Sequence, residues 1–541
     1  MTKAPRAILS ALGSCAACAL AAISPSAAKA QSVDLTATDR IVDEGGRHSE
    51  VMDIAEYLSD TIGQRLTNSP GDRKAIAWTQ DKFRNWGLTN VRTEGFPFGR
   101  GWWMDHCLVR MIDPRPLALT SGPISWSPGT NGPITAPIVV APMESEGDFV
   151  QWKGKLAGKI VLISSPDRAR SPFPYTRQSA DDLAKMDPYE FPRPATDGSE
   201  SWRKQYMFPR ALQAFLKAEG ALAFVRIPRL DGKLIMGDGA RSAPDDAMPL
   251  PGIEIAAEDY RRLVRLAARG GAPTLQLDLA VHFDDSDLQA YNVFADIRGT
   301  DPKAAYVMAG GHLDSVTPGD GAADDGAGVA MVMEAARILS KMPRPRRTIR
   351  FALWSGEEQG EIGSIAYVAR HFATRGTARD MEATGEAMFF RWQHLWPIVP
   401  RPTWGEMSVY FNLDNGSGKI RGIFAERNLA AIPIFREWLQ PFQSMGATTV
   451  ATAVQGGSDN DAMQDVGVPG FQFIQDWDDY GRMHHTSLDT YDHLDPDDMR
   501  QASIILASFL WNAANMTQDF PRRPLPTKPS ASLPTKPASA Q

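Results

Sequence analysis

The chain has 541 residues, of which 43% are hydrophobic and 22% are charged, and its formal net charge at pH 7 is -7. These proportions are ordinary for a globular protein, and the length suits two or more domains that each bury a core. The acidic balance argues against nucleic acid or an anionic membrane surface as the main partner.

Residues 1–30 have the pattern of a signal peptide. Lys3 and Arg6 precede an alanine-rich apolar run over 7–23, and Ala28-Lys29-Ala30 has the small-x-small pattern of a cleavage site. We therefore expect cleavage near Ala30 and a mature protein that is periplasmic or secreted. No later stretch reaches the roughly 20 apolar residues that a membrane span requires, so no membrane span is predicted.

Residues 31–120 are expected to form the first part of a main domain. The spacing of the apolar residues Ile76, Trp78 and Phe83 predicts a helix over 74–86, and the pattern over 91–96 predicts a strand.

Residues 121–285 are expected to form a separate unit inserted into the main domain. Short strand-like runs at 138–140, 159–163 and 221–225 are separated by glycine and proline, which predicts a small β-rich unit. The segments GKIVLI, AEGALAFV and PGIEIAAEDYRRL resemble a protease-associated domain, a module inserted in several exopeptidases.

Residues 286–518 are expected to complete the main domain as an α/β fold, with a mostly parallel central sheet flanked by helices. Strand, loop and helix patterns alternate here, and the run over 349–354 is almost continuously apolar, as in strands buried on both faces. The tail, 519–541, repeats LPTKP and is predicted to be Pro-rich and disordered. Further strands are predicted at 291–295, 306–309, 407–413 and 471–474, and a helix at 329–339.

Histidine and acidic residues follow the ends of four of these predicted strands. In open α/β sheets, ligands bind where strands end at their carboxyl side. Histidine and carboxylate ligands without cysteine suit zinc or a similar divalent ion. The residues concerned are His312, Glu357, Glu358, Asp414, His484 and His485, together with the pair Asp324-Asp325 before the predicted helix.

The charge of these acids indicates more than one metal ion. Asp324, Glu358 and Asp414 together carry three negative charges. Two divalent ions and a hydroxide balance them, and two metals about 3.5–4 Å apart are a recurrent arrangement in hydrolytic enzymes.

The motifs HLD, ADDGAG, GEE, NLD and HHTSLDT occur in this order along the chain. In order and spacing they resemble the motifs of the dinuclear zinc exopeptidase family that includes bacterial leucyl aminopeptidases and carboxypeptidase Q, over about residues 51–514. The resemblance implies the fold of that family, two Zn²⁺ per chain, and a secreted enzyme that hydrolyses the terminal peptide bonds of short peptides.

The resemblance also implies which residues would bind the metals. His312 and Asp414 would bind one zinc ion, and Glu358 and His485 would bind the other. Asp324, the first residue of the Asp-Asp pair, would bridge both ions.

Supporting roles follow from the same resemblance. Glu357 would be the general base, which takes a proton from a metal-bridging water and returns it to the leaving amine. Asp314 would orient the ligand imidazole two residues before it, and Asp489 would do the same near the second ligand imidazole. Asp325 is expected to cap the helix that follows it. A cis bond between the two acids of the Asp-Asp pair is expected as well.

The substrate pocket is predicted to include Asn415, Asn460 and His484. Asn460 stands where many relatives have histidine, so the pocket departs from the pattern of the family. The segment 372–404 is longer than in many relatives and is expected to form a lid or rim on the pocket. A structural role or a homodimer contact is the alternative for this segment.

The sequence leaves the nature of the site and the class of substrate open. Taken singly, the acidic pairs are consistent with solvated turns or helix caps, and only their joint order favours a metal site. An aminopeptidase needs acids that face a substrate amine, whereas a dipeptidase or carboxypeptidase needs Arg or Lys that faces a carboxylate; Arg421 and Arg482 are candidates. A non-catalytic binding module on the same fold is the alternative outside enzymes. Loss of ligands would mark such a module, and none is lost here.

Overall fold

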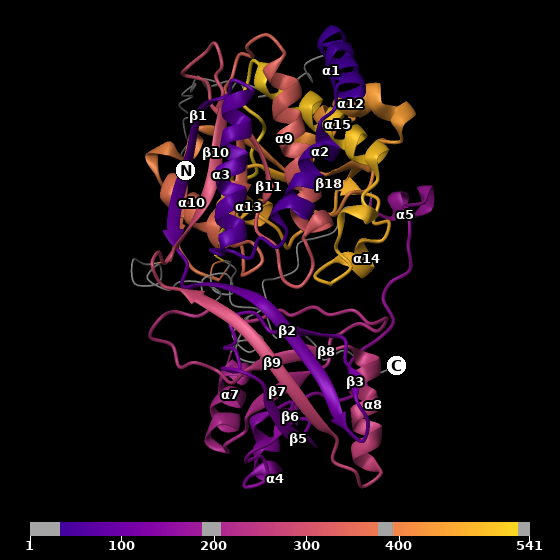
Figure 1. Ribbon diagram of the computed structural model, residues 1–541. Helices are drawn as coiled ribbons and strands as arrows, with labels where there is room; N and C mark the ends of the chain where they lie inside the picture. Colours follow the sequence, from indigo (N-terminus) through magenta and orange to yellow (C-terminus); the bar gives the residue numbers. More distant parts are fainter. Residues whose placement is uncertain (1–32, 187–206, 377–391, 393, 529–541) are drawn as a thin grey trace, which may run out of the picture.

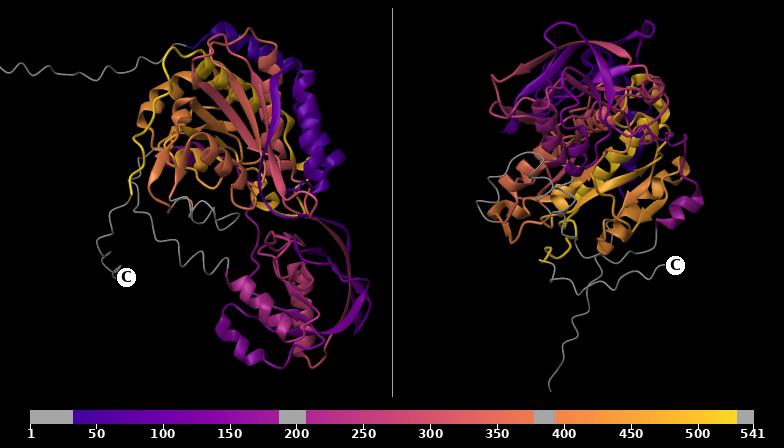
Figure 2. Two further views of the ribbon diagram at one scale, coloured as in Figure 1. Left: turned by 90° about the vertical axis from the view of Figure 1, so that its left-hand side faces the viewer. Right: turned by 90° about the horizontal axis from the view of Figure 1, so that it is seen from below.

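Two eight-stranded sheets organise the chain, and each is the centre of one lobe. The computed structural model describes residues 33–186, 207–376, 392 and 394–528. The main lobe is the upper one in Figure 1 and the second lobe is the lower one, and the left view of Figure 2 separates them. The predicted signal peptide lies outside the described residues. Among the described helices, none is long and apolar enough to cross a membrane.

The main sheet has the strand order β1-β10-β12-β11-β15-β18-β16-β17. Its central strands β12, β11, β15 and β18 run parallel. Toward one edge β10 is antiparallel to β12 and β1 is antiparallel to β10, and toward the other edge β16 is antiparallel to β18 while β17 is parallel to β16. This arrangement confirms the predicted α/β fold with a mostly parallel centre. The strands are β1 (Thr89–Pro97), β10 (Gln289–Ile297), β11 (Tyr306–His312), β12 (Ile349–Trp354), β15 (Met407–Asn412), β16 (Ile420–Phe424), β17 (Thr449–Ala451) and β18 (Gly470–Gln475).

Helices cover both faces of the main sheet and make its strands apolar on both sides. On one face α9 lies between the sheet and α2 and α15, and almost all of its residues are buried. The α3 helix begins at Pro70, earlier than predicted, because Ser69 accepts a hydrogen bond from Asp72 N and proline fits the first turn. The helices of this face are α1 (Leu35–Arg47), α2 (Val51–Glu56), α3 (Pro70–Asn85), α9 (Ala327–Ser340), α12 (Ile432–Leu439) and α15 (Pro496–Asn515), and those of the other face are α10 (Ile362–His371) and α13 (Asn460–Gln464).

The second lobe is built on a mixed sheet with the strand order β3-β2-β9-β5-β6-β7-β8-β4. The sequence predicts that the inserted unit starts at residue 121, but this sheet already begins at Gly101. The strand β2 pairs with β9 along its whole length, from Gly101 opposite Asp284 to Asp113 opposite Thr274. These two long strands run down from the main lobe (Figure 1). The elements are β2 (Gly101–Asp113), β3 (Leu117–Ala118), β4 (Ser121–Pro123), β5 (Ile134–Val140), α4 (Phe149–Trp152), β6 (Ile160–Leu162), α7 (Phe208–Ala218), β7 (Ala223–Arg226), β8 (Gly252–Ile255), α8 (Ala257–Ala268) and β9 (Thr274–Asp284). The short helix α5 (Ala180–Lys185) comes from the same part of the chain but packs on the main lobe, where Leu183 contacts the end of the main sheet.

The segment 372–404 does not form the predicted lid in the part that the structure describes. Phe372 and Trp392 are buried in the apolar cluster beneath α10. Ala373–Arg375 (β13) pairs with Ile398–Pro400 (β14) as a small separate ribbon. None of the described residues of this segment lines the large cavity considered below.

The predicted disorder of the tail is wrong for residues 519–528. Phe520 is buried and its ring packs on Phe435 and Phe471. Its backbone N–H donates to Ser408 Oγ at 3.0 Å, and Asp519 forms an ion pair with buried Arg347 at 2.7 Å. Phe520 stands just before the first LPTKP repeat, and it belongs to the hydrophobic core of the main lobe. Residues 529–541 lie outside the described residues.

We expect Phe520→Ala to lower the free energy of unfolding of the main lobe by about 3–5 kcal/mol, because it leaves a cavity among packed aromatic rings. Denaturant unfolding followed by tryptophan fluorescence measures the change. Thr527→Ala, at an exposed position of the same tail, is the control and should stay within about 0.5 kcal/mol of wild type. An unchanged midpoint for Phe520→Ala would show that the tail does not contribute to the core.

Candidate metal centre

The predicted ligands meet at the carboxyl-terminal edge of the central strands. His312 is the last residue of β11 and pairs in register with Trp354, the last residue of β12. Glu358 follows β12 and Asp414 follows β15, so parallel neighbours deliver these side chains to one edge. The structure thus places His312 in the strand itself, where the sequence predicted a position just after it.

The other two predicted ligands come from loops that reach the same edge. Asp324 lies in the irregular turn Ala322–Gly326 before α9, and its bond to Asp325 is cis, as expected. His485 follows the short helix α14 (Tyr480–Met483) with a positive φ of 59°. A non-glycine residue in that conformation is uncommon and is often found at functional sites.

Asp324 is the centre of the group, with a different histidine near each of its carboxylate oxygens. His312 Nε2 lies 3.4 Å from Asp324 Oδ1 and 3.7 Å from Asp414 Oδ1. His485 Nε2 lies 3.4 Å from Asp324 Oδ2 and 2.9 Å from Glu358 Oε2. Ligands of a tetrahedral zinc ion stand about 3.3–3.5 Å apart, given bonds of about 2.0–2.2 Å. The spacing therefore fits two adjacent metal sites that share Asp324.

Unsatisfied atoms in the group also fit a bound cation. Asp324 Oδ2 and Glu358 Oε1 are buried and have no hydrogen-bond partner. Buried carboxylate oxygens are almost always paired, so two such atoms side by side indicate a missing positive partner. His312 Nδ1 donates to the backbone carbonyl of Asp314 at 2.9 Å. Since a carbonyl only accepts, Nδ1 carries the hydrogen, and in the neutral imidazole the lone pair of His312 Nε2 faces the carboxylates.

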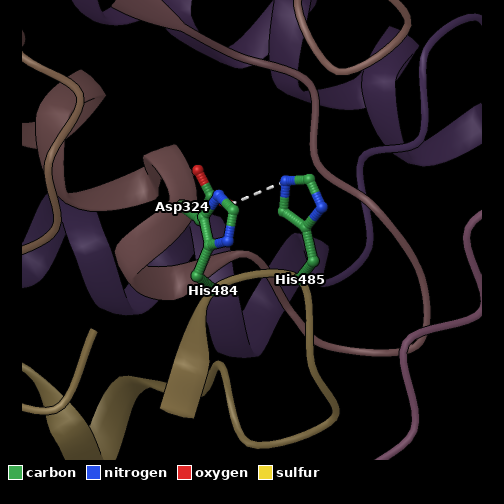
Figure 3. A group of neighbouring side chains, drawn as sticks. All are labelled: Asp324, His484 and His485. Carbon is green, nitrogen blue, oxygen red and sulfur yellow. Dashed lines mark ion pairs between the residues drawn. The ribbon is translucent and has the colours of Figure 1, made fainter. Parts of the chain in front are cut away.

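His484 and His485 both approach Asp324, and Figure 3 shows the three side chains together. The two rings stack with centroids 4.0 Å apart. His484 Nε2 lies 3.7 Å from Asp324 Oδ2, farther than His485 Nε2, and it has no contact with Glu358 among the ion pairs of the described residues. The geometry favours His485 as the ligand and leaves His484 on the side of the open cavity, which it lines.

The electrostatics of the group show how strongly it attracts positive charge. Burial acts against a charged imidazole at His485, but the carboxylates of Glu358 and Asp324 outweigh burial and raise its pKa to about 10. Burial raises the pKa of Glu358 to about 7, although His485 opposes this effect. For Glu357, burial and the nearby charges of Asp414 and Asp459 raise the pKa well above its usual value. The acids outnumber the histidines in this group, and a divalent ion would neutralise their negative charge.

Comparison with known proteins identifies the family of the part of the chain that holds these residues. The stretch 292–510, which contains every predicted ligand, matches the family model described as peptidase family M28. This part of the chain belongs to peptidase family M28. The match confirms the family that the motifs predicted and the predicted class of enzyme, a metallo-exopeptidase.

The similarity extends over most of the chain. The chain is 28% identical to carboxypeptidase Q from Bos taurus over 470 residues, which cover 86% of this chain and 85% of that protein. A peptidase M28 precursor from Shewanella amazonensis has a similar structure, with a TM-score of 0.63, 24% identity, and coverage of 91% of this chain and 99% of that one. BSAP, a zinc aminopeptidase from Bacillus subtilis, gives a TM-score of 0.55 and 18% identity, with coverage of 86% and 95%. These two structures share the fold of this chain.

The predicted supporting acids are close to the centre, but two of them act differently from the expectation. Asp489 does not orient His485; its oxygens accept hydrogen bonds from the backbone N–H groups of Ala323 and Asp324, at 2.6 and 3.1 Å. Asp314 reaches His312 chiefly through its backbone carbonyl, while the nearer of its carboxylate contacts to that ring is 3.8 Å. The physical reason is that backbone N–H groups lie within hydrogen-bond distance of both carboxylates: those of Ala323 and Asp324 donate to Asp489, and that of Glu357 donates to Asp314.

The Asp314 carboxylate instead stabilises the segment that carries Glu357. Its Oδ2 accepts a hydrogen bond from Thr67 Oγ1 at 2.7 Å, and its Oδ1 accepts one from Glu357 N at 3.3 Å. Asp325 caps α9 as predicted, since its Oδ1 accepts from Gly328 N at 3.0 Å while its Oδ2 accepts from His312 N at 3.1 Å.

Residues that the sequence did not reveal complete the surroundings of the ligands. Tyr480 donates its hydroxyl to Asp324 Oδ1 at 3.1 Å. Asp238, from the second lobe, places Oδ1 3.8 Å from His485 Nδ1. Tyr480 lies close to the histidines in the sequence and its position was a usable signal, whereas nothing in the sequence connects Asp238 with a histidine so far along the chain.

Arg65 is a third such residue and holds the loop between the ligands His312 and Asp324. Its buried guanidinium donates to the carbonyls of Leu313, Asp320 and Gly321 at 2.8, 2.8 and 2.7 Å, and also reaches those of Leu58 and Gly63. Burial lowers the pKa of Arg65, against the raising effect of nearby acids.

The predicted pocket residues Asn415, Asn460 and His484 all line a cavity of about 1120 Å³ that opens from the centre toward the second lobe. Asn460 donates to Gln455 O at 3.1 Å, and its side-chain oxygen has no partner. Their contact with substrate stays a prediction. Arg421 and Arg482 do not line this cavity; they pair with Asp476 and Asp479 instead.

We expect Arg65→Met to lower the free energy of unfolding by about 3 kcal/mol or more, because several buried carbonyls lose their donor at once. Urea unfolding at constant pH measures the loss. Arg84→Met, on the exposed face of α3, is the matched control and should change stability by no more than about 0.5 kcal/mol. Equal stability of the two variants would mean that water replaces the guanidinium without cost.

Proposed function

We propose that the protein is a secreted exopeptidase that binds two zinc ions and hydrolyses the terminal bond of short peptides. The observation that carries this proposal is the position of Asp324 between two histidines. His312 Nε2 lies near Asp324 Oδ1 and near Asp414, and His485 Nε2 lies near Asp324 Oδ2 and near Glu358. A carboxylate with a separate histidine–carboxylate pair at each oxygen is suited to a shared ligand of two divalent ions. Zinc also agrees with the structurally similar protein from Bacillus subtilis, which is a zinc aminopeptidase.

The residues would divide between holding the metals and moving the proton. His312 and Asp414 would hold one ion, His485 and Glu358 the other, and Asp324 both. Bound zinc supplies two effects at neutral pH: it lowers the pKa of water and polarises a carbonyl. The chain itself supplies the orientation of the ligands, through the hydrogen bonds from Tyr480 and to Asp489.

Glu357 is placed to be the base of the reaction. It lines the cavity, and its Oε2 lies 4.0 Å from His312 Nε2, beside the ligands. The Glu357 carboxylate takes a proton from the attacking water as the new C–O bond forms at the substrate carbonyl. The same oxygen then gives that proton to the amine nitrogen as the C–N bond breaks, so the base is regenerated.

A non-catalytic binding module is the less favoured alternative. A module that had lost its chemistry would be free to lose ligands or the base, yet all six side chains are present and lie together.

We further propose that the second lobe is the protease-associated unit predicted from the sequence. It closes one side of the cavity and would thereby restrict access to short peptides, because a folded substrate could not pass between the lobes.

Metal analysis tests the shared ligand. We expect about two zinc ions per wild-type chain by elemental analysis after dialysis against a metal-buffered solution. His485→Ala removes a ligand of one site and should keep about one ion, whereas Asp324→Ala should lose both, because each site depends on one of its oxygens. Fewer than one tightly bound ion in the wild-type protein would rule out the proposed function.

The base is tested by Glu357→Gln, which keeps the shape of the side chain and removes the proton acceptor. We expect kcat on a short peptide to fall about 10²–10⁴-fold while the zinc content stays at the wild-type value. Glu406→Gln, at an exposed position away from the cavity, is the control and should keep full activity. Full activity in Glu357→Gln would assign the base to another residue.

A further inference from the structure

The loop that carries His485 is held on both sides by the second lobe. Before the histidine, Thr176 and Asp478 exchange two backbone hydrogen bonds, at 3.0 and 2.8 Å. After it, Ser487 N donates to Ile235 O at 2.8 Å, and Ile235 N donates to Ser487 Oγ at 3.2 Å. The main lobe therefore supplies this histidine, while contacts with the second lobe hold the segment in which it lies.

The backbone conformation of His485 needs such support. Its φ of 59° lies in the left-handed region, which non-glycine residues seldom adopt. A residue keeps a sparsely populated conformation only where its surroundings over-determine it. The backbone hydrogen bonds at Asp478 and Ser487 provide that constraint, because they fix the chain on either side of the histidine.

The two nitrogens of the His485 ring face different lobes. Nε2 faces the main lobe, 2.9 Å from Glu358 Oε2 and 3.4 Å from Asp324 Oδ2, and Figure 3 shows the other ring nitrogen turned away from Asp324. A neutral imidazole that binds a metal through Nε2 carries its hydrogen on Nδ1, and that hydrogen needs an acceptor. The carboxylate of Asp238, in the second lobe, faces Nδ1 with its Oδ1 at 3.8 Å.

Asp238 is suited to be that acceptor. Its Oδ1 is buried and has no hydrogen-bond partner, which is rare for a carboxylate oxygen. Its backbone is held in place, because Arg226 Nη2 donates to the Asp238 carbonyl at 2.8 Å and is itself paired with Glu254 at 2.7 Å. The separation of 3.8 Å from the His485 ring is about 1 Å longer than a usual N–H···O hydrogen bond, so a small rotation of the carboxylate would complete the bond.

The neighbouring ring of His484 has the opposite kind of partner in the second lobe. Arg229 Nη2 lies 3.4 Å from His484 Nδ1. A guanidinium only donates, so Nδ1 accepts, and the hydrogen of the neutral ring is on Nε2, which faces Asp324. That nitrogen then has no lone pair for a metal. Of the two adjacent histidines, His485 is therefore the one that can bind a metal ion beside Asp324.

We propose that Asp238 is a positioning residue of the metal centre, which accepts the Nδ1 hydrogen of His485 and holds that ring with Nε2 toward the carboxylates. This inference rests on the proposed function and gives the second lobe a part in building one of the two metal sites. A carboxylate that accepts from a ligand histidine fixes its tautomer and orientation and raises its basicity. The site of His312 would not depend on Asp238, because that imidazole donates to the carbonyl of Asp314.

The test measures the zinc affinity of each site by competition with a chromophoric chelator. We expect Asp238→Ala to raise the Kd of one zinc ion about 10- to 100-fold and to leave the Kd of the other close to that of wild type. The unchanged ion shows that the variant is folded. Asp238→Asn should lose less affinity, since its side-chain oxygen can still accept the hydrogen.

Asp245→Ala is the matched control, because it removes an exposed carboxylate of the second lobe that does not line the cavity. It should bind both ions as wild type does. A double-mutant cycle tests whether Asp238 acts through His485: in the His485→Ala background, which keeps about one ion, adding Asp238→Ala should leave the Kd of that ion unchanged.

Three outcomes would overturn this inference while the proposed function stands. They are no weakening of either ion in Asp238→Ala, equal weakening of both ions, and a further loss of affinity in the double variant. Fewer than one tightly bound ion in the wild-type protein would instead overturn both proposals.

Discussion

The buried carboxylate of Asp324 is the constraint on which the organisation of the main lobe depends. Removing a carboxylate from water costs several kcal/mol unless cations or donors compensate for it. Here the compensation is divided: Tyr480 donates to one oxygen, while Asp489 holds the backbone of the turn so that the other oxygen faces His485. The two oxygens thereby point to different ligand pairs, which is the feature that distinguishes this group from a helix cap.

Rigid elements bring the remaining ligands to that carboxylate. Parallel strands end at one edge, so His312, Glu358 and Asp414 arrive from neighbours whose register is set by backbone hydrogen bonds. The buried guanidinium of Arg65 holds the loop between His312 and the turn in place, because it donates hydrogen bonds to backbone carbonyls of that loop. Of the five candidate ligands, His312 lies within a strand, Glu358 and Asp414 lie shortly after the strands β12 and β15, and Asp324 and His485 come from longer connections.

Much of this could be predicted from the sequence, for identifiable reasons. The strand Ile349–Trp354 was predicted to the residue, because a run that is buried on both faces has no polar alternation to blur its ends. The start of α3 was missed because the proline at position 70 suggested a turn, whereas Ser69 caps a helix that begins at that proline. The packing of Phe520 was missed because the tail has a repeat pattern, whereas its ring stacks on Phe435 in the core. The roles expected for Asp314 and Asp489 were misplaced because both bind backbone groups, which a pattern of side chains does not show.

The sequence by itself determined the α/β patterning, and it predicts five candidate ligands, a candidate base and an inserted unit, since each depends on residue type and order along the chain. Only the tertiary structure decided which oxygen of Asp324 faces which histidine, and that Arg421 and Arg482 are excluded from the cavity while Asp238 and Arg229 belong to it. The physical reason is distance along the chain: the two lobes meet through residues more than two hundred positions apart, and their contacts arise from folding rather than from any local pattern.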